Sequence, residues 1–353
     1  MTASPLVLGL DVGGSTTRVL VADLTGRILG AARGPGGNPL SNGEPAAARA
    51  IADTLGAALA DVDPGRVAAG VLGLAGGRAG APELARIWSG AGLPRAPRLT
   101  GDVELAYAAG TGRPDGTALI SGTGAVAALF RDFAMVRCAD GHGWLLGDRG
   151  SGFWLGRAAV RTALTAVDRG ELPPTGLAAE VVAALLPGPL PGPPPEPPAQ
   201  EVPVAEREGA GALRLRAALI GAVHAEPPVR LARLAPLVLD AARAGDPAAR
   251  RLVERAADHL LESLGTVREP GSALPVVLAG GVLDAATPLA EAVRARVADR
   301  WPRARVTHAG NGAGAAAWLA ARSLGGPADL TELHRRLVRV PAPVAGPDGS
   351  VRP

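Results

Sequence analysis

The sequence contains no lysine and only one cysteine, and each of these facts excludes a class of chemistry. All 36 basic residues among the 353 are arginines. A Walker-type phosphate loop and a lysine Schiff base both need the ammonium group, so neither is present. The lone cysteine, Cys138, forbids an intrachain disulfide and any cysteine-ligated cluster within one chain.

Long apolar runs and a strong excess of charge are also missing. No run approaches the length of a membrane span, and the opening residues lack the basic and apolar regions of a signal peptide. The formal net charge is only +3, so no electrostatic footprint for nucleic acid is visible. We therefore expect a cytoplasmic protein of about two domains, with small-molecule partners and neither a nucleic acid nor a membrane partner.

The first motif in the chain is a glycine-rich turn. Between Leu6 and Asp23, two apolar runs flank a turn of one Asp, two Gly and three hydroxyl residues, which is typical of a β-hairpin entered from a buried strand. The amides of Gly14 to Thr16 can converge on an anion, and Asp11 at the strand end is placed to hold a cation. These features indicate a site for a Mg-nucleotide, with an ordinary glycine-rich hairpin as the competing interpretation.

The same pattern recurs in residues 117–130. An apolar run is followed by the turn Ser121-Gly122-Thr123-Gly124 and by a second apolar run. The repeat predicts two related halves, each beginning with a hairpin whose tip binds phosphate. Strands and helices alternate in the intervening residues, which predicts α/β architecture.

Polar residues at strand ends and in loops are the next candidates. Asp102 lies where a short strand turns sharply into a helix, a place that suits both a ligand-binding carboxylate and a helix cap. Asn38 lies in a glycine-rich loop, where it is either a turn former or a ligand contact. Ser151 is expected to cap a helix that reaches about Val167, and Asp148 precedes that cap.

Two later segments complete the pattern. The buried strand that begins at Pro275 ends in Gly280-Gly281, where a flat base could lie against bare backbone, although a simple strand-to-helix turn is the alternative. The segment 187–203 is rich in proline and is expected to be an extended insertion without chemistry.

Five motifs together stand in the order found in the sugar kinase, heat-shock protein and actin superfamily. They are Asp11-Val12-Gly13-Gly14-Ser15-Thr16-Thr17, Thr100-Gly101-Asp102, Ser121-Gly122-Thr123-Gly124, Gly147-Asp148-Arg149-Gly150-Ser151 and Leu278-Ala279-Gly280-Gly281-Val282. Within that superfamily the chain most resembles the N-acetylglucosamine kinases, from about Leu6 to Ala320. The resemblance implies an α/β, two-domain actin-like ATPase fold, built from duplicated ribonuclease H-like domains with a nucleotide cleft between them.

The resemblance also divides the chain into parts. It implies a smaller N-terminal domain (1–117), a larger C-terminal domain (118–325) that carries the proline-rich insertion at about 187–203, and a C-terminal helix with a loose tail (326–353). Relatives often dimerise, so a homodimer is expected.

Site roles follow from the resemblance residue by residue. It implies that Asp11 lies by a Mg²⁺ ion and that Asp102 is the catalytic base, which also contacts the sugar. It assigns ATP binding to Gly13, Gly14, Ser15, Thr16, Gly122, Thr123, Gly124, Gly280 and Gly281, and sugar binding to Asn38, Asp102, Gly143 and Asp148. The implied reaction is ATP-dependent phosphorylation of the 6-hydroxyl of N-acetyl-D-glucosamine. One departure is Arg149, which stands where relatives carry an acidic residue.

Three alternatives remain open at the level of sequence. N-acetylmuramic acid or another hexosamine could be the acceptor, with Arg149 or Arg137 facing a lactyl carboxylate. An activator ATPase of the 2-hydroxyacyl-CoA dehydratase type has a similar core, but such relatives hold an iron–sulfur cluster with paired cysteines, and Cys138 is alone. A sugar-sensing regulator would need a DNA-binding helix-turn-helix, and only five residues precede Leu6.

Overall fold

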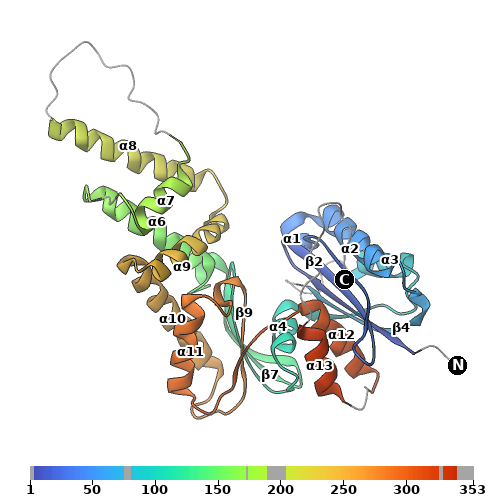
Figure 1. The fold of residues 1–353 in the computed structure, drawn as a ribbon. Coiled ribbons are helices and arrows are strands. Elements are labelled where there is room, and N and C mark those ends of the chain that lie inside the picture. Colours follow the sequence, from blue (N-terminus) through green and yellow to red (C-terminus); the bar gives the residue numbers. More distant parts are fainter. Residues whose placement is uncertain (1–3, 75–80, 172–173, 189–203, 326–328, 340–353) are drawn as a thin grey trace.

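The computed structural model describes residues 4–74, 81–171, 174–188, 204–325 and 329–339 (Figure 1). Most of the proline-rich insertion, residues 189–203, and the expected tail after residue 339 lie outside the described residues.

The first half of the chain forms a five-stranded sheet with the strand order β3-β2-β1-β4-β5. Its strands are β1 (Leu6–Val12), β2 (Thr16–Asp23), β3 (Ile28–Pro35), β4 (Val67–Leu74) and β5 (Arg98–Gly101). Strands β1, β2 and β3 form an antiparallel meander, while β4 runs parallel to β1 and β5 parallel to β4. The expected hairpin is therefore present, and it leads into the parallel part of the sheet.

The second half repeats this arrangement in the order β10-β9-β6-β7-β8. Its strands are β6 (Gly116–Ser121), β7 (Ala125–Arg131), β8 (Ala134–Asp140), β9 (Val276–Ala279) and β10 (Val306–His308). Again three strands form an antiparallel meander and two run parallel to the first of them. Equal strand order and direction in the two sheets confirm the predicted duplication and the α/β, actin-like fold.

Helices connect and cover these strands. Those of the first half are α1 (Pro39–Asn42), α2 (Glu44–Leu59), α3 (Ala81–Gly90) and α4 (Asp102–Gly110). Those after β8 are α5 (Gly143–Leu146), α6 (Gly152–Asp168), α7 (Leu177–Leu185), α8 (Val204–His224), α9 (Ala235–Ala244), α10 (Pro247–Val267), α11 (Pro288–Arg300), α12 (Gly312–Ser323) and α13 (Leu330–Arg339). Short 3-10 turns occupy Pro64–Arg66, Pro228–Leu234 and Gly281–Leu283. None of the helices in the described part of the chain is long and apolar enough to cross a membrane.

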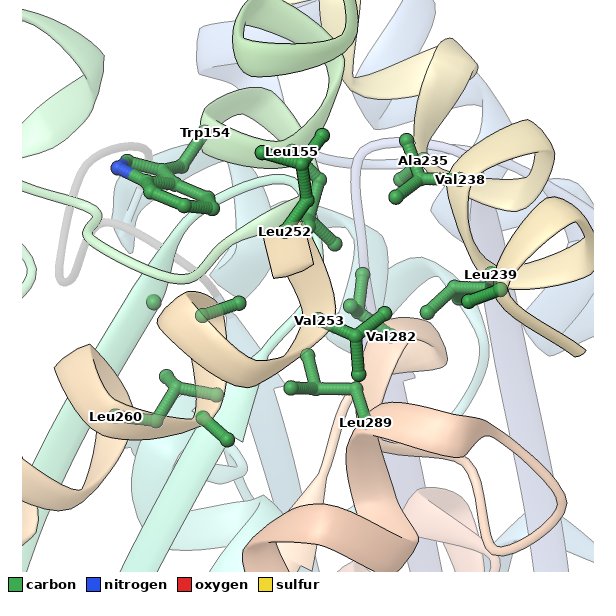
Figure 2. Packing of buried hydrophobic residues seen from close by; sticks show 14 of the residues in the cluster. Trp154, Leu155, Ala235, Val238, Leu239, Leu252, Val253, Leu260, Val282 and Leu289 are labelled. Atoms are coloured by element: carbon green, nitrogen blue, oxygen red, sulfur yellow. The ribbon is translucent and has the colours of Figure 1, made fainter. Parts of the chain in front are cut away.

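Each sheet packs a hydrophobic core on its outer face. Helices α2 and α3 bury Ile51, Leu55 and Trp88 against the first sheet. Helices α6, α9, α10 and α11 form the larger core of the second half, part of which is drawn in Figure 2. Burial of apolar surface on this scale is the main favourable contribution to folding.

Helices α4 and α12 lie between the two sheets and join the halves. Their buried residues form one cluster with side chains of both sheets. Helix α12 comes so close to β1 that a Cβ atom on Gly9 would lie 2.0 Å from the Ala313 carbonyl oxygen. Only glycine fits there, because any larger residue would overlap the helix backbone. Helix α12 belongs by sequence to the expected C-terminal domain, residues 118–325, yet it packs on the sheet of the first half, as Figure 1 shows.

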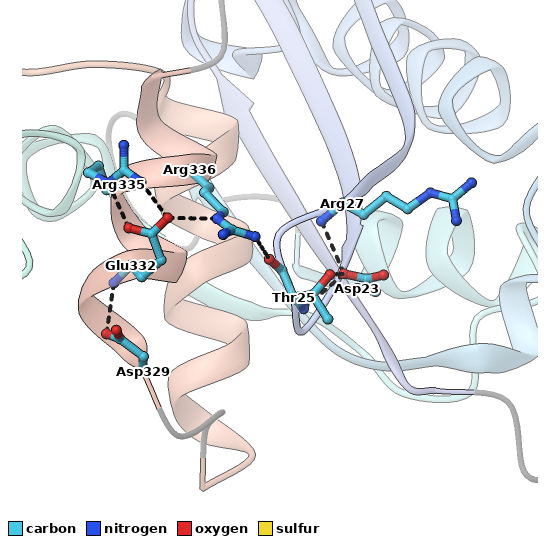
Figure 3. Close-up of polar contacts among 7 residues, drawn as sticks. All are labelled: Asp23, Thr25, Arg27, Asp329, Glu332, Arg335 and Arg336. Carbon is cyan, nitrogen blue, oxygen red and sulfur yellow. Dashed lines mark hydrogen bonds and ion pairs between the residues drawn. The ribbon is translucent and has the colours of Figure 1, made fainter.

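Helix α13 fastens the end of the described chain to the first sheet (Figure 3). Arg336 donates from Nη1 to the Thr25 carbonyl oxygen in the β2–β3 turn at 3.0 Å, and its Nε donates to Glu332 at 2.8 Å. These contacts hold the first sheet to the helices that follow the second one.

Candidate active site

The first glycine-rich loop joins β1 to β2 and is held from behind. The backbone N–H of Asn38 donates a hydrogen bond to the Gly13 carbonyl oxygen at 3.3 Å. The side-chain Nδ2 of Asn42 donates one to the Gly14 carbonyl oxygen at 2.9 Å. Gly14 and Ser15 are exposed. The loop carbonyls are thus drawn toward α1, which leaves the tip accessible to an anion.

Asp11 lies at the end of β1, beside this loop. The hairpin register pairs it with Arg18, whose Nη1 is 3.2 Å from Asp11 Oδ2. Burial raises the pKa of Asp11 and the negative charge of Asp102 raises it further, whereas Arg18 lowers it. A Cβ atom on Gly312, at the start of α12, would lie 2.5 Å from Asp11 Oδ2. Neither Arg18 nor Gly312 was predicted from the sequence as part of the site; only the hairpin register could have indicated Arg18.

Asp102 begins α4, directly after β5. Strands β1, β4 and β5 are parallel, and their register brings Val12 beside Leu74 and Leu74 beside Gly101. Asp11 and Asp102 therefore lie at the same edge of the first sheet. Asp102 lines a cavity of about 900 Å³, and desolvation by the surrounding protein raises its pKa although the side chain remains open to solvent.

Asn38 is the N-cap of α1. Its Oδ1 accepts a hydrogen bond from the Leu40 amide at 2.9 Å, and the residue is 4% exposed. This is the turn-forming role that the sequence allowed. A contact between Asn38 and a sugar stays a prediction.

The second loop, Ser121–Gly124, is bound to the start of α6. The Gly152 and Phe153 amides donate to the Gly122 and Thr123 carbonyls at 2.7 and 3.2 Å. Ser151 accepts a hydrogen bond from the Trp154 amide at 3.1 Å, as expected of the predicted cap. The loop and the first turn of α6 therefore form one hydrogen-bonded unit.

Asp148 lies beneath the second loop. Its Oδ1 accepts the Ala125 amide at 3.1 Å, and a Cβ atom on Gly124 would come within 2.9 Å of the same oxygen. The residue has φ +55° and is 8% exposed, and burial raises its pKa. Asp140, which was not predicted from the sequence as part of the site, accepts a hydrogen bond from the Asp148 backbone amide at 2.6 Å. The structure thus gives Asp148 a role in holding the loop, while sugar binding by this residue stays a prediction.

The three remaining predicted glycines differ in their surroundings. Gly280 has φ +90°, and a Cβ atom there would lie 2.3 Å from the Ser121 carbonyl oxygen. A Cβ atom on Gly281 or on Gly143 would meet nothing within 4 Å, so both backbones are open to a ligand. Gly280 therefore brings β9 against the second loop, and Gly281 offers the bare surface expected for a base.

Arg149, the departure from the family pattern, turns toward α10. Its Nη1 lies 2.9 Å from Glu262 Oε2, and its other terminal nitrogen contacts His259. The side chain is therefore already paired in the structure.

Comparison with protein families decides the relationship, because the family model for BadF/BadG/BcrA/BcrD ATPases matches residues 8–318. The chain belongs to this family. Both glycine-rich loops, Asp102, Asp148 and the Gly280-Gly281 pair lie within the region that the family model matches. No curated protein matches the chain in sequence.

The chain is also similar to solved structures of proteins that bear the names of sugar kinases. A provisionally named N-acetylglucosamine kinase from Chromobacterium violaceum is 26% identical, with a TM-score of 0.65 over 90% of this chain and 99% of that one. A protein of the same provisional name from Porphyromonas gingivalis is 23% identical, with a TM-score of 0.57 over 84% and 91% of the two chains. A ROK family glucokinase from Streptomyces griseus, solved with glucose and AMPPNP, is 19% identical, with a TM-score of 0.52 over 90% and 99%. The last two support the fold alone.

Proposed function

We propose that this ATPase-family protein is a sugar kinase that transfers the γ-phosphoryl group of ATP to the 6-hydroxyl of N-acetyl-D-glucosamine. The observation that carries the proposal is the placement of Asp11 and Asp102 at one edge of the first sheet, beside a glycine-rich loop with an accessible tip. In this arrangement the Asp11 carboxylate could bind a cation, and the Asp102 carboxylate beside it could accept a proton.

Each carboxylate suits its proposed task. Asp102 accepts the proton of the sugar hydroxyl as the oxygen attacks phosphorus, and its raised pKa makes it a stronger base than an ordinary aspartate. Within the described residues no cluster of three or more His, Cys, Asp or Glu side chains could hold a metal ion. Asp11 fits Mg²⁺ nevertheless, because this ion binds one or two carboxylates together with substrate phosphates and water. Mg²⁺ would supply charge stabilisation on the phosphate oxygens.

The glycine-rich loops take the place of the missing lysine. We assign the β- and γ-phosphates to Gly13, Gly14, Ser15 and Thr16 and to the opposing loop Gly122, Thr123 and Gly124. Preorganised backbone amides stabilise developing negative charge without a charged side chain. Gly281 is proposed to lie against the adenosine, and Asn38, Gly143 and Asp148 are proposed to contact the sugar.

N-acetylglucosamine is the preferred acceptor because the Chromobacterium violaceum protein of that provisional name is similar over 99% of its length. N-acetylmuramic acid is the second candidate, but Arg149 is already paired with Glu262 and is a poor partner for its extra carboxylate. An activator ATPase finds less support, since Cys138 is exposed on β8 and is the chain's only cysteine.

The test is ADP release with Mg-ATP and a panel of hexoses, for wild type and for Asp102→Asn. We expect turnover with one acetylated hexosamine, and a fall in kcat of about 10²–10⁴-fold in the variant with little change in either KM. Asp299→Asn, the same change on the exposed part of α11, is the matched control and should retain full activity. Equal ADP release with and without every sugar would refute the kinase proposal and favour the activator ATPase.

A further inference from the structure

A groove between α6 and α10 is lined by arginines and shares no residue with the proposed site. It encloses about 510 Å³, and its basic side chains are Arg157, Arg161, Arg169, Arg251 and Arg255. Its inner wall includes Trp154 and Leu252; Figure 2 shows Trp154 at the edge of the buried cluster and Leu252 beside Leu155. The groove is therefore apolar at its base and cationic around its rim.

These five arginines share one cavity, and their charges are not neutralised by an ion pair with a carboxylate among the described residues. Some other arginines in the part of the chain that the structure covers do pair with carboxylates, as Arg216 does with Asp168 and Arg243 with Asp240. Among the described residues, none of the five groove arginines forms an ion pair, and the sole carboxylate on the lining is that of Glu171. Five like charges around one cavity create a local positive potential that a bound anion would relieve.

We propose that this groove binds a small molecule that carries two or more phosphate groups. Arg157 and Arg161 lie one helical turn apart on α6, and Arg251 and Arg255 lie one turn apart on α10, so two pairs of guanidinium groups line the same cavity. Each guanidinium can bind a phosphate with two parallel hydrogen bonds. More than one phosphate is needed to engage both pairs.

The dimensions of the groove favour a small molecule over a nucleic acid. Its volume lies in the range of about 300–1,000 Å³ that is usual for small-molecule sites. The Arg255 guanidinium lies 5.7 Å from the centre of the largely buried Trp154 ring, and this cation–π contact holds the guanidinium at the groove. A nucleic acid would instead need a basic stripe across the surface, and the net charge is only +3.

The experiment uses tripolyphosphate as the probe, titrated calorimetrically into metal-free protein at low salt. We compare wild type with Arg161→Glu/Arg251→Glu, and with Arg214→Glu as the control on the exposed part of α8. The double variant should bind the probe about a hundredfold more weakly, because one charge is reversed on each side of the groove. The control should bind within about twofold of wild type, since Arg214 lies outside the groove.

Two further measurements separate the groove from the nucleotide cleft and from misfolding. The Kd for Mg-ADP and the midpoint of thermal unfolding should be unchanged in the double variant, and Arg161→Ser/Arg251→Ser provides a milder second version. Equal probe binding by wild type and both double variants would overturn the proposal. So would a parallel loss of ADP affinity, which would place the probe in the nucleotide cleft, or tighter binding of a short oligonucleotide that the same variants abolish. None of these readouts depends on sugar phosphorylation, so failure here is distinct from failure of the proposed function.

Discussion

At the scale of single residues, the raised pKa values of Asp11 and Asp102 make activity sensitive to acid. The pKa of each carboxyl is raised chiefly by loss of hydration, and the charge of Asp102 adds to the effect on Asp11. Both must be ionised in the proposed reaction, one to hold a cation and one to accept a proton. The active form therefore exists only above their pKa values.

We expect kcat/KM for the sugar to be constant near neutral pH and to fall as the pH drops through an apparent pKa above the value of about 3.9 for an ordinary aspartate. The midpoint belongs to the interacting pair and not to either residue alone. A pH–rate profile at saturating Mg-ATP measures it, and thermal unfolding over the same range controls for acid denaturation. A rate that stays flat down to that ordinary value would contradict the assignment.

A second prediction concerns Asp148, whose carboxylate holds the second loop through the Ala125 amide. Asp148→Ala removes the acceptor from a buried N–H group, which should cost about 1–3 kcal/mol in the free energy of unfolding. Asp148→Asn keeps an oxygen acceptor and tolerates positive φ. Burial raises the pKa of Asp148, so ionisation destabilises the fold once the pH exceeds the unfolded-state pKa, and the neutral Asn should be at least as stable at pH 7.

Chemical denaturation of the two variants separates these effects. If Asp148 also contacts the sugar, Asp148→Asn raises the KM for sugar without lowering stability. An alanine variant as stable as wild type would show that the carboxylate does not hold the loop.

At the scale of elements, the second loop, Ser121–Gly124, contacts the start of α6 and the end of β9. Gly280 and Gly281 are neighbours in the chain, but a side chain at Gly280 would clash with the loop, whereas one at Gly281 would meet no atom within 4 Å. The same substitution at the two positions therefore tests the contact with the loop. Gly280→Ala would place a Cβ atom 2.3 Å from the Ser121 carbonyl at φ +90° and should destabilise the protein by about 2–5 kcal/mol.

Gly281→Ala meets no atom within 4 Å, so its stability should match that of wild type. Its new methyl group would occupy the surface proposed for the adenosine and should raise the KM for ATP. Thermal unfolding and ATP titrations of both variants test the pair. Equal stability loss in the two variants would mean that the contact between Gly280 and the loop is not the cause.

Some of these elements could be predicted from the sequence and others could not. Local signals were sufficient for the hairpin around Gly13, for the Ser151 cap and for Asp102 at a strand-to-helix turn, because each depends on neighbours along the chain. They could not show that the Asp148 carboxylate turns beneath the loop, which requires a left-handed backbone at that residue. The contact of Gly312 with Asp11 was equally hidden, because it joins opposite ends of the sequence.

At the scale of the whole molecule, α4 and α12 form a shared core between the sheets. Because residues of both sheets pack in one cluster, neither half can lose its structure without exposing apolar surface of the other. We therefore expect one cooperative unfolding transition, although the chain contains two duplicated halves.

Tryptophans are placed well for this test. Trp88 belongs to the outer core of the first half, and Trp301 to that of the second. In each of two variants that retain one of these tryptophans, the denaturation curve followed by fluorescence should coincide with the curve followed by circular dichroism. Separate fluorescence and circular dichroism midpoints within one variant would show that the shared core does not couple the halves.

The single exposed thiol on β8 gives the molecule one natural attachment point for a probe, and it lies on the second half. Ser89, exposed on α3 of the first half, differs from cysteine by one atom. Ser89→Cys therefore yields a protein with one thiol on each half and requires no removal of native cysteines. Spin labels or dyes on these two sites would measure the separation of the halves, and its response to nucleotide and sugar, as a distribution of distances.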